Sequence, residues 1–458
     1  MKIEQIYTGC LAQGAYYIVS EGEAAIIDPL REIKPYINRA KNDGVRIKYI
    51  FETHFHADFV SGHIDLAKAT GATIVYGPTA KTAFQSHQAK DNEVFLLGKI
   101  ELKVLHTPGH TLESSCYLLY DEQHQEKAIF TGDTLFIGDV GRPDLAQKAA
   151  HLTQDELAGL LYDSLRTKIM TLPEEVLVYP AHGAGSACGK HMSKETVSTI
   201  GEQKKTNYAL RGDMTKADFI KEVTDGLLPV PAYFPLNVQL NQEGYENIEH
   251  VLKRANHPLT PGAFEQTANE TGALILDTRS AEQFAVSFIP HAINIGIEGG
   301  FAPWVGTLVP DILQPILLIT EEGKQEEVAT RLARVGYDHT IGYLSGGMSA
   351  WIAAGKEVDY VDHISAEEFA SDHSSSKKVV DVRTEEEFDK GHLAIANNIP
   401  LDGLSNYMAG LSKHEPLYVH CASGYRSMIA VSMLKARGFD QVINIDGGYQ
   451  AIEKGMKV

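Results

Sequence analysis

Short apolar runs, each ended by a polar or glycine-rich turn, recur through roughly the first 240 residues of the chain. Residues 24–29, 47–51, 128–130 and 176–179 have the length and composition of buried strands. Helical stretches and turns separate these runs, and polar motifs follow the last three directly. The pattern predicts a layered α/β fold with its chemistry at the ends of the strands.

The first domain is predicted to end near a cluster of prolines. Pro229, Pro231 and Pro235 break the chain, and a helical pattern follows over residues 244–256. We therefore expect a first domain over residues 1–245.

The C-terminal half of the chain contains an internal repeat. Residues 276–279 (LDTR) match residues 380–383 (VDVR), and similar pairs continue along both segments. Two domains of about one hundred residues are expected, over residues 257–357 and 360–458. Within the second copy, the polar run at residues 371–378 is predicted to be a surface loop.

Composition limits the classes of partner. The 458 residues carry a net charge of −19, which argues against nucleic acid and anionic membranes as partners. No apolar run reaches the length of about eighteen residues that a membrane span needs. The N-terminal segment lacks the layout of a signal peptide, so a cytoplasmic location is expected. The four cysteines are too few and too scattered for a disulfide framework.

Residues of the kinds that bind metals follow the strand-like runs in a fixed order. The spacing of His54 and His56 allows both rings to turn toward one centre, and Gly109 and Gly132 allow tight turns beside further candidates. The candidates lie in the motifs HFHAD, TPGH, TGD and PAH, and they are His54, His56, Asp58, His110, Asp133 and His182.

This order of motifs resembles the metallo-β-lactamase superfamily, and within it the persulfide dioxygenases. The resemblance implies an αββα sandwich and one Fe(II) held by His54, His110 and Asp133. Two imidazoles and one carboxylate on one face form the ligand set of non-haem iron oxygenases, which leaves positions open for substrate and O₂.

The same resemblance assigns His56, Asp58 and His182 to the surroundings of the metal, where they orient ligands or serve as alternative ligands. Phe59 stands where relatives carry a further metal-binding histidine. Its presence favours one metal over two, but the choice between iron and zinc stays open.

A cysteine loop near the C-terminus is the second chemical motif. The apolar run 416–419 leads to Cys421, and a helical pattern follows over residues 428–437. Backbone N–H groups and the positive end of a helix stabilise a thiolate or persulfide anion. Arg426 adds a positive charge suited to the oxygens of sulfite or thiosulfate.

This loop resembles the active loop of rhodanese sulfurtransferases, and the likeness extends over residues 361–458. It implies that Cys421 carries sulfur and that the loop binds the substrate through Ala422, Ser423, Gly424, Tyr425 and Ser427. The first copy carries Thr320 and Gln325 at the positions of the cysteine and the arginine, so it is expected to be an inactive rhodanese-like domain.

Three cysteines and one arginine remain to be interpreted. Cys188 follows His182 in a glycine-rich segment, where Lys190 could favour a thiolate, so Cys188 either relays sulfane sulfur or packs in the core. Cys10 and Cys116 lie in strand-like contexts and are expected in the core. Arg142 follows the Asp133 loop and is a candidate to orient an anionic substrate.

The main hypothesis is a fusion enzyme of sulfide detoxification. The first domain would oxidise a persulfide of glutathione, coenzyme A or a bacterial thiol to sulfite with O₂, and Cys421 would move sulfur between persulfide, sulfite and thiosulfate. A zinc thioesterase of the glyoxalase II kind is the first alternative, in which a metal-bound hydroxide attacks a thioester. A non-catalytic sulfur carrier or scaffold is the second. Self-association is compatible with all three.

Overall fold

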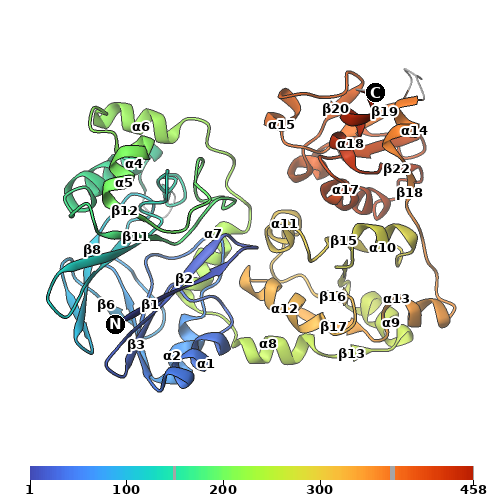
Figure 1. Cartoon of the computed structure of the whole chain (residues 1–458). Coiled ribbons are helices and arrows are strands. Elements are labelled where there is room, and N and C mark those ends of the chain that lie inside the picture. The colour runs from blue at the N-terminus through green and yellow to red at the C-terminus, as the bar shows by residue number, and fades with distance from the viewer. Residues whose placement is uncertain (148–150, 372–376, 457–458) are drawn as a thin grey trace. The chain divides into compact units, whose positions relative to one another are not determined.

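The computed structural model describes residues 1–147, 151–371 and 377–456, which form two compact units (Figure 1). The first unit is Met1–Ile248 with Ala333–Gly336, and the second is Glu249–Leu332 with Tyr337–Val458. The middle of the polar run expected to be a surface loop, residues 372–376, lies outside the described residues.

Two six-stranded mixed sheets form the centre of the first unit, with strand orders β1-β2-β3-β4-β5-β6 and β12-β11-β10-β9-β8-β7. The first sheet contains β1 (Lys2–Thr8), β2 (Gln13–Ser20), β3 (Glu23–Ile27), β4 (Arg46–Phe51), β5 (Thr73–Tyr76) and β6 (His87–Gln88). The second contains β7 (Val94–Leu97), β8 (Ile100–His106), β9 (Ser115–Tyr120), β10 (Glu126–Gly132), β11 (Leu177–Pro180) and β12 (Ser198–Thr199).

Helices cover the outer faces of both sheets, and each layer boundary is filled by buried apolar side chains. Tyr36 and Leu66 pack the first sheet against α1 and α2, and Leu161 and Phe219 pack the second against α4 and α6. The helices of this unit are α1 (Lys34–Asp43), α2 (His63–Thr70), α4 (Gln154–Ser164), α5 (Ile200–Thr206), α6 (Lys216–Thr224), α7 (Phe234–Glu243) and α8 (Ile248–Ala255), the last of which continues into the second unit.

A third apolar cluster fills the space between the two sheets, so the layers read helix, sheet, sheet, helix. Phe51 from β4 and Tyr117 from β9 meet there with ring centroids 4.7 Å apart. The expected αββα sandwich is therefore confirmed. The predicted strands at residues 24–29, 47–51 and 128–130 correspond to β3, β4 and β10, and their ends carry the polar motifs.

The second unit contains two five-stranded parallel sheets with one shared topology. The orders are β13-β17-β16-β14-β15 and β18-β22-β21-β19-β20, which are the same order in successive copies. The strands are β13 (Pro258–Leu259), β14 (Leu274–Asp277), β15 (Ile293–Asn294), β16 (Ile316–Ile319), β17 (Thr340–Leu344), β18 (Asp362–Ile364), β19 (Lys378–Asp381), β20 (Ala396–Asn398), β21 (Leu417–His420) and β22 (Val442–Ile445).

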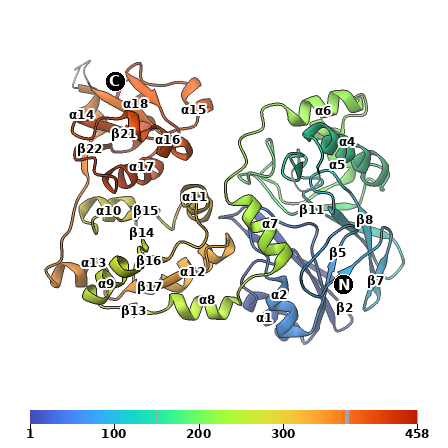
Figure 2. The same ribbon diagram turned by 180° about the vertical axis from the view of Figure 1, so that it is seen from behind.

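Helices flank both of these sheets (Figure 2). They are α9 (Pro261–Thr271), α10 (Ala281–Val286), α11 (Phe301–Leu308), α12 (Gln325–Arg334), α13 (Gly347–Ala353), α14 (Ala366–Ser371), α15 (Glu385–Asp389), α16 (Leu404–Tyr407), α17 (Tyr425–Lys435) and α18 (Gly448–Met456).

The register of the strands repeats as well. Asp277 pairs with Asn294 in the first copy, and Asp381 pairs with Asn398 in the second. In both copies the asparagine amide donates to the backbone carbonyl of its aspartate, over 3.0 Å. The internal repeat read from the sequence is therefore a repeat of structure. Among the described helices, none is long and apolar enough to cross a membrane.

Replacing Phe51 with alanine is expected to destabilise the first unit by about 3–5 kcal/mol, because it removes a fully buried ring between the sheets. Calorimetric unfolding measures the effect. Leu96→Ala is the control, since Leu96 on β7 is 58% exposed and its loss should cost less than about 0.5 kcal/mol. Equal effects of the two substitutions would contradict the layer arrangement.

Candidate metal centre and sulfur-transfer loop

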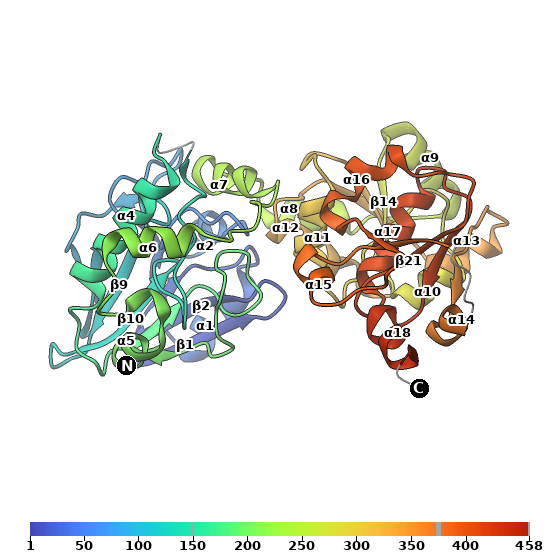
Figure 3. The same cartoon turned by 90° about the horizontal axis from the view of Figure 1, so that it is seen from above.

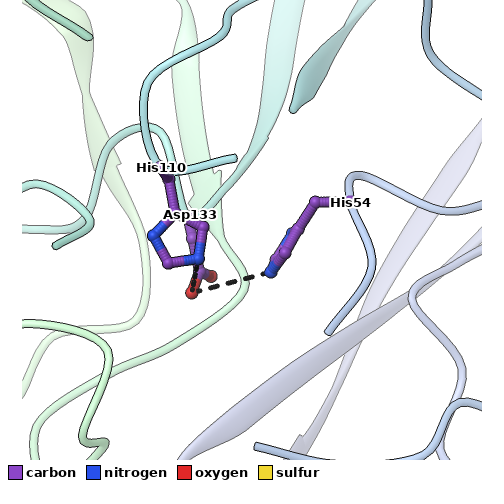
Figure 4. A group of neighbouring side chains, drawn as sticks. All are labelled: His54, His110 and Asp133. Atoms are coloured by element: carbon purple, nitrogen blue, oxygen red, sulfur yellow. Dashed lines mark ion pairs between the residues drawn. The ribbon is translucent and has the colours of Figure 1, made fainter. Parts of the chain in front are cut away.

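His54, His110 and Asp133 converge at the ends of strands in the first unit (Figure 4). His54 follows β4, His110 lies between β8 and β9, and Asp133 follows β10. The Nε2 atoms of His54 and His110 lie 3.9 and 3.4 Å from Asp133 Oδ2. All three residues are buried, and one ligand atom from each falls within 4.8 Å of the other two.

Hydrogen bonds behind the two histidines leave both Nε2 atoms free to act as ligands. The Thr53 hydroxyl donates to Asp28 Oδ2 over 2.9 Å, so its oxygen accepts from His54 Nδ1 over 3.0 Å. His110 Nδ1 lies 2.9 Å from the Arg142 carbonyl, which can only accept. Each ring therefore carries its proton on Nδ1 and presents the Nε2 lone pair to the centre.

Charge and burial also fit a bound cation. Burial and the nearby His56 hold the pKa of His54 well below its usual range, so the ring is neutral. Burial opposes ionisation of Asp133, but His182 and His54 outweigh it and lower the pKa of that carboxyl. Asp133 Oδ2 is buried without a hydrogen-bond partner, which is the state expected of a ligand atom.

Two glycines make room for this arrangement. Gly109 has φ +149°, and a Cβ there would lie 2.4 Å from the Leu161 backbone. Gly132 has φ +52°, and a Cβ there would lie 2.5 Å from Thr53 Oγ1. Glycine is therefore needed at both turns for its backbone conformation and for space.

His182 and Asp58 form a chain that ends on Asp133. His182 Nδ1 lies 2.9 Å from Asp133 Oδ1, and its Nε2 lies 2.8 Å from Asp58 Oδ2. Burial lowers the pKa of His182, but the two carboxylates outweigh it and raise that pKa well above its usual value. The hydrogen bond between His182 Nδ1 and Asp133, together with the ion pair between His182 Nε2 and Asp58, would orient Asp133, the role expected for His182 and Asp58 beside the metal.

His56 does not turn toward the same centre as His54, contrary to the expectation from their spacing. Its Nε2 lies 3.1 Å from Asp28 Oδ1 and 3.4 Å from Glu52 Oε2 in a second buried cluster. The Phe59 ring packs against it, with centroids 4.3 Å apart. The bends in the chain at Thr53 and His54 break the alternation that would place both rings on one side.

Cys188 lies beside Asp58 and His182, with ligand atoms of all three within 4.8 Å of one another. The expected activation by Lys190 is not found, because the Lys190 amine donates to the carbonyls of Glu222 and Asp225, over 2.7 Å each. Burial and Asp58 raise the pKa of the Cys188 thiol well above its usual value. These observations favour the packing interpretation over the sulfur relay.

Cys116 and Cys10 differ in burial. Cys116 is fully buried, and burial raises its pKa to about 11, as expected of a core residue. Cys10 is only partly buried, so the expectation that it lies in the core was wrong.

Arg142 is not available to a substrate, which corrects the role expected for it. Its guanidinium forms two hydrogen bonds of 2.6 and 2.7 Å to Asp144, and its side chain is only 3% exposed. It also donates to the carbonyls of Ala187 and Leu228. Its contribution to the centre comes from its own carbonyl, which holds His110.

The Cys421 loop begins where β21 ends and closes at the start of α17. The backbone N–H of Gly424 donates to Cys421 Sγ over 3.1 Å. Ser423, Gly424 and Tyr425 line a cavity of about 1090 Å³ within the second unit. The sulfur thus faces the Gly424 N–H directly before the N-terminus of α17, in line with the expected form of the loop.

Three other residues of the loop, which were expected to bind the substrate, contact other parts of the protein. Arg426 forms a bidentate ion pair with Glu387, at 2.6 and 2.7 Å, so its charge is already neutralised. Ser427 is fully buried and its hydroxyl donates to Asn444 Oδ1 over 2.8 Å. The carbonyl of Ala422 accepts from the N–H of Gln450 in α18.

The first copy has the same fold but lacks the reactive cysteine. Thr320 follows β16 as Cys421 follows β21, and its hydroxyl donates to the Glu321 carbonyl over 2.7 Å. Asp277 and Arg279 form the same ion pair as Asp381 and Arg383 in the second copy.

Sequence reasoning missed several residues that hold the site. Asp28 and Asn241 are the main ones, since the Asn241 amide donates to the carbonyls of His56 and Phe59, both over 2.8 Å. Asn241 lies more than 180 positions from these partners, so no local pattern could reveal it. Asp28 directly follows an apolar strand, as the predicted ligands do, so its position in the sequence could have identified it.

Comparison with known proteins agrees with both halves of the chain. The family model for the metallo-beta-lactamase superfamily matches residues 8–182, and the model for the rhodanese-like domain matches residues 260–354 and 365–454. The chain is 31% identical to human persulfide dioxygenase ETHE1 over 221 residues, which cover 48% of this chain and 78% of that protein. It is 28% identical to a probable hydroxyacylglutathione hydrolase of Schizosaccharomyces pombe over 219 residues, 46% of this chain and 80% of that one.

A crystal structure of a metallo-beta-lactamase from Staphylococcus aureus matches with a TM-score of 0.66 and 32% identity. The match covers 75% of this chain and 98% of the other. Together with the αββα sandwich and the repeated parallel sheets, these likenesses establish the family. The chain belongs to the metallo-β-lactamase superfamily, in a form that is fused to two rhodanese-like domains.

Proposed function

We propose that the chain is a persulfide dioxygenase fused to a sulfurtransferase. The first unit would oxidise the sulfane sulfur of a low-molecular-weight persulfide to sulfite with O₂, and Cys421 would transfer sulfane sulfur. The observation that carries the proposal is the buried group of His54, His110 and Asp133, in one chain with a rhodanese-type cysteine loop.

The donor set supports a single redox-active metal at this group. Two neutral imidazoles and one carboxylate are the ligands of mononuclear non-haem iron oxygenases, although zinc accepts the same donors. A bound ferrous ion would supply the O₂ chemistry that protein side chains lack. Phe59, which packs on His56, stands where the family resemblance implies a further metal-binding histidine. Asp58, His182 and Cys188 form a separate buried group whose donors could hold a second metal.

The side chains around the group prepare it for that role. Thr53 and the Arg142 carbonyl fix the ring tautomers of His54 and His110. His182 holds Asp133 Oδ1, so the other carboxylate oxygen stays aimed at the centre. Burial of all these groups excludes bulk water, which would otherwise compete for the ligand atoms.

The overall oxidation balances without a further reductant. A persulfide R–S–SH, one O₂ and one water give the thiol R–SH and sulfurous acid, which ionises to sulfite. The sulfane sulfur loses electrons, O₂ gains them, and the sulfur–sulfur bond breaks. Sulfite formed in this way is a substrate for sulfur transfer.

Cys421 would carry the transferred sulfur as a persulfide. A Cys421 thiolate attacks the outer sulfur of thiosulfate, the sulfur–sulfur bond breaks, and sulfite leaves with the bonding electrons. In the opposite direction, sulfite attacks the outer sulfur of Cys421 persulfide, the bond from that sulfur to Cys421 Sγ breaks, the Cys421 thiolate keeps the bonding electrons, and thiosulfate is released. Both directions balance, and both use the N–H of Gly424 to hold negative charge on sulfur.

A zinc-dependent thioester hydrolase is the alternative, and the likeness to a probable hydroxyacylglutathione hydrolase supports it. Such a hydrolase would act on a thioester of a small thiol and would consume no O₂. The two functions therefore separate in one assay.

The first experiment is to measure metal content and O₂ uptake on protein purified without air and given glutathione persulfide or coenzyme A persulfide. We expect about one iron per chain and persulfide-dependent O₂ uptake with sulfite as product. Bound zinc, thioester hydrolysis and no O₂ uptake after loading with iron would refute the dioxygenase and support the hydrolase.

Thr53→Val is expected to weaken metal binding by about 10–100-fold, because the hydroxyl that orients His54 is lost while the shape is kept. Competition with a chelator measures the affinity. Thr73→Val is the matched control, since Thr73 is exposed on β5 and should leave the affinity unchanged. If both variants bind metal like the parent chain, the hydrogen bond between Thr53 and His54 does not contribute to metal binding.

Glu387→Gln is expected to lower the KM for thiosulfate by up to about tenfold, because it frees Arg426 for the anion. The ion pair with Arg426 lowers the pKa of Glu387 and burial raises it by less, so the pKa is about 2. The carboxylate is therefore ionised and competes with the substrate throughout the neutral range. Glutamine can still cap the start of α15. The control is Glu386→Gln on the same helix, and an unchanged KM in Glu387→Gln would show that Arg426 does not bind the substrate.

A further inference from the structure

Tyr425, a residue of the active loop, extends into the inactive copy. Its hydroxyl donates to the backbone carbonyl of Gly296 over 2.8 Å. Burial raises the pKa of Tyr425 above its usual value, so the hydroxyl stays protonated and remains a donor. Tyr425 is the first residue of α17, the helix that packs against β15 and α10 (Figure 1), and Figure 3 shows α17 and α10 from above.

The ring of Tyr425 occupies a slot beside Gly296 and Gly299, and the room for the ring comes from Gly299. A Cβ on Gly299 would lie 2.2 Å from Tyr425 Cζ, and a Cβ on Gly296 would lie 3.5 Å from Tyr425 Cε2. Neither glycine has a positive φ, so the backbone conformation does not require glycine at either position. At Gly299 the requirement is space for the ring, whereas a Cβ on Gly296 would make an ordinary contact with it.

The slot is anchored to the scaffold of the inactive copy. Between the two glycines, the N–H of Ile297 donates to the Thr278 carbonyl over 3.0 Å, and its own carbonyl accepts from Arg331 over 2.7 Å. Arg331 lies on α12, the helix that corresponds to α17 of the active copy. In the inactive copy, α12 thus holds the turn against which Tyr425 packs.

A second contact holds the same face of α17. The backbone N–H of Asn294 donates to Ser432 Oγ over 3.0 Å, and both residues are buried. Ser432 lies seven residues after Tyr425, which is two helical turns and therefore the same side of the helix. The inactive copy thus contacts α17 at its first residue and again two turns later.

The contact of Tyr425 with the inactive copy is one residue away from the hydrogen bond to Cys421. Gly424, the neighbour of Tyr425, donates its N–H to Cys421 Sγ and has φ +115°. A shift of the Tyr425 backbone would move this N–H and the start of α17, which together face the sulfur. The slot residues also adjoin the cavity that the loop lines, since Gly296, Ile297 and Glu298 form part of its wall.

We propose that the inactive copy is a positioning device for the Cys421 loop, with the Gly296–Gly299 slot and Tyr425 as the positioning pair. The pair holds the Gly424 N–H on the sulfur and so sets the rate of sulfur transfer. This inference rests on the proposed sulfur-transfer function of Cys421. It explains why a copy without a cysteine keeps the complete fold.

Gly299→Ala in the full chain tests the proposal. The added methyl group displaces the Tyr425 ring, and we expect kcat for sulfur transfer from thiosulfate to cyanide to fall at least about tenfold with KM nearly unchanged. Alkylation of Cys421 by iodoacetamide, followed by mass spectrometry, should slow by a similar factor. Gly262→Ala is the control in the same copy, because a Cβ there meets open space, and it should change neither rate.

Tyr425 variants separate positioning from simple packing. Tyr425→Phe keeps the ring and loses the hydrogen bond, so a fall of about threefold in kcat is expected. Tyr425→Ala removes the ring, and in that background Gly299→Ala should cause no further loss, because the two effects share one cause. These variants also keep the test open if Gly299→Ala fails to fold.

The proposal is overturned if Gly299→Ala transfers sulfur like Gly262→Ala, or if its effect adds fully to that of Tyr425→Ala. It is also overturned if the loss of rate only follows a loss of thermal stability. If the parent chain transfers no sulfur at all, the proposed function of Cys421 fails, and the iodoacetamide rates alone decide whether the slot positions the loop.

Discussion

The carboxylate of Asp28 is the group on which the geometry of the first site depends. It accepts from the backbone N–H of Thr53 and from its hydroxyl, over 2.8 and 2.9 Å, and it lies 3.1 Å from His56. A buried carboxylate is stable only when donors surround it. Asp28 therefore draws the segment from Thr53 to His56 into one conformation, and His54 takes its orientation from that conformation.

Both candidate sites use a strand end to place a reactive group, but they achieve rigidity differently. At the metal group, side chains orient other side chains, and nearly every polar atom is buried. At Cys421, the backbone N–H of Gly424 faces the sulfur, and the neighbouring domain holds the loop through Tyr425. The first arrangement suits a permanent ligand, and the second suits a sulfur that must meet changing partners.

The sequence predicted the features that depend on the order of strands and motifs along the chain. The layered fold and the repeat followed from strand-like runs and repeated motifs, whereas the choice of His54, His110 and Asp133 as one ligand set came from the resemblance to the persulfide dioxygenases. The errors concern residues whose partners are distant or compete with the expected one. Glu387 takes the charge of Arg426 from 39 positions away, and Asp28 and Glu52 draw His56 out of line with His54. Patterning places a residue near a site, but the balance between competing partners decides where its side chain points.

The shared topology of the two rhodanese-like copies has a consequence for folding. Adjacent domains with the same strand order can exchange elements while the chain folds, which leads to misassembly. Here the equivalent strands differ in sequence, since β16 is ILLI and β21 is LYVH. A strand from one copy would bring side chains of the wrong size and polarity into the other. Divergence between the copies therefore protects the chain from pairing with itself, independently of what either copy does once folded.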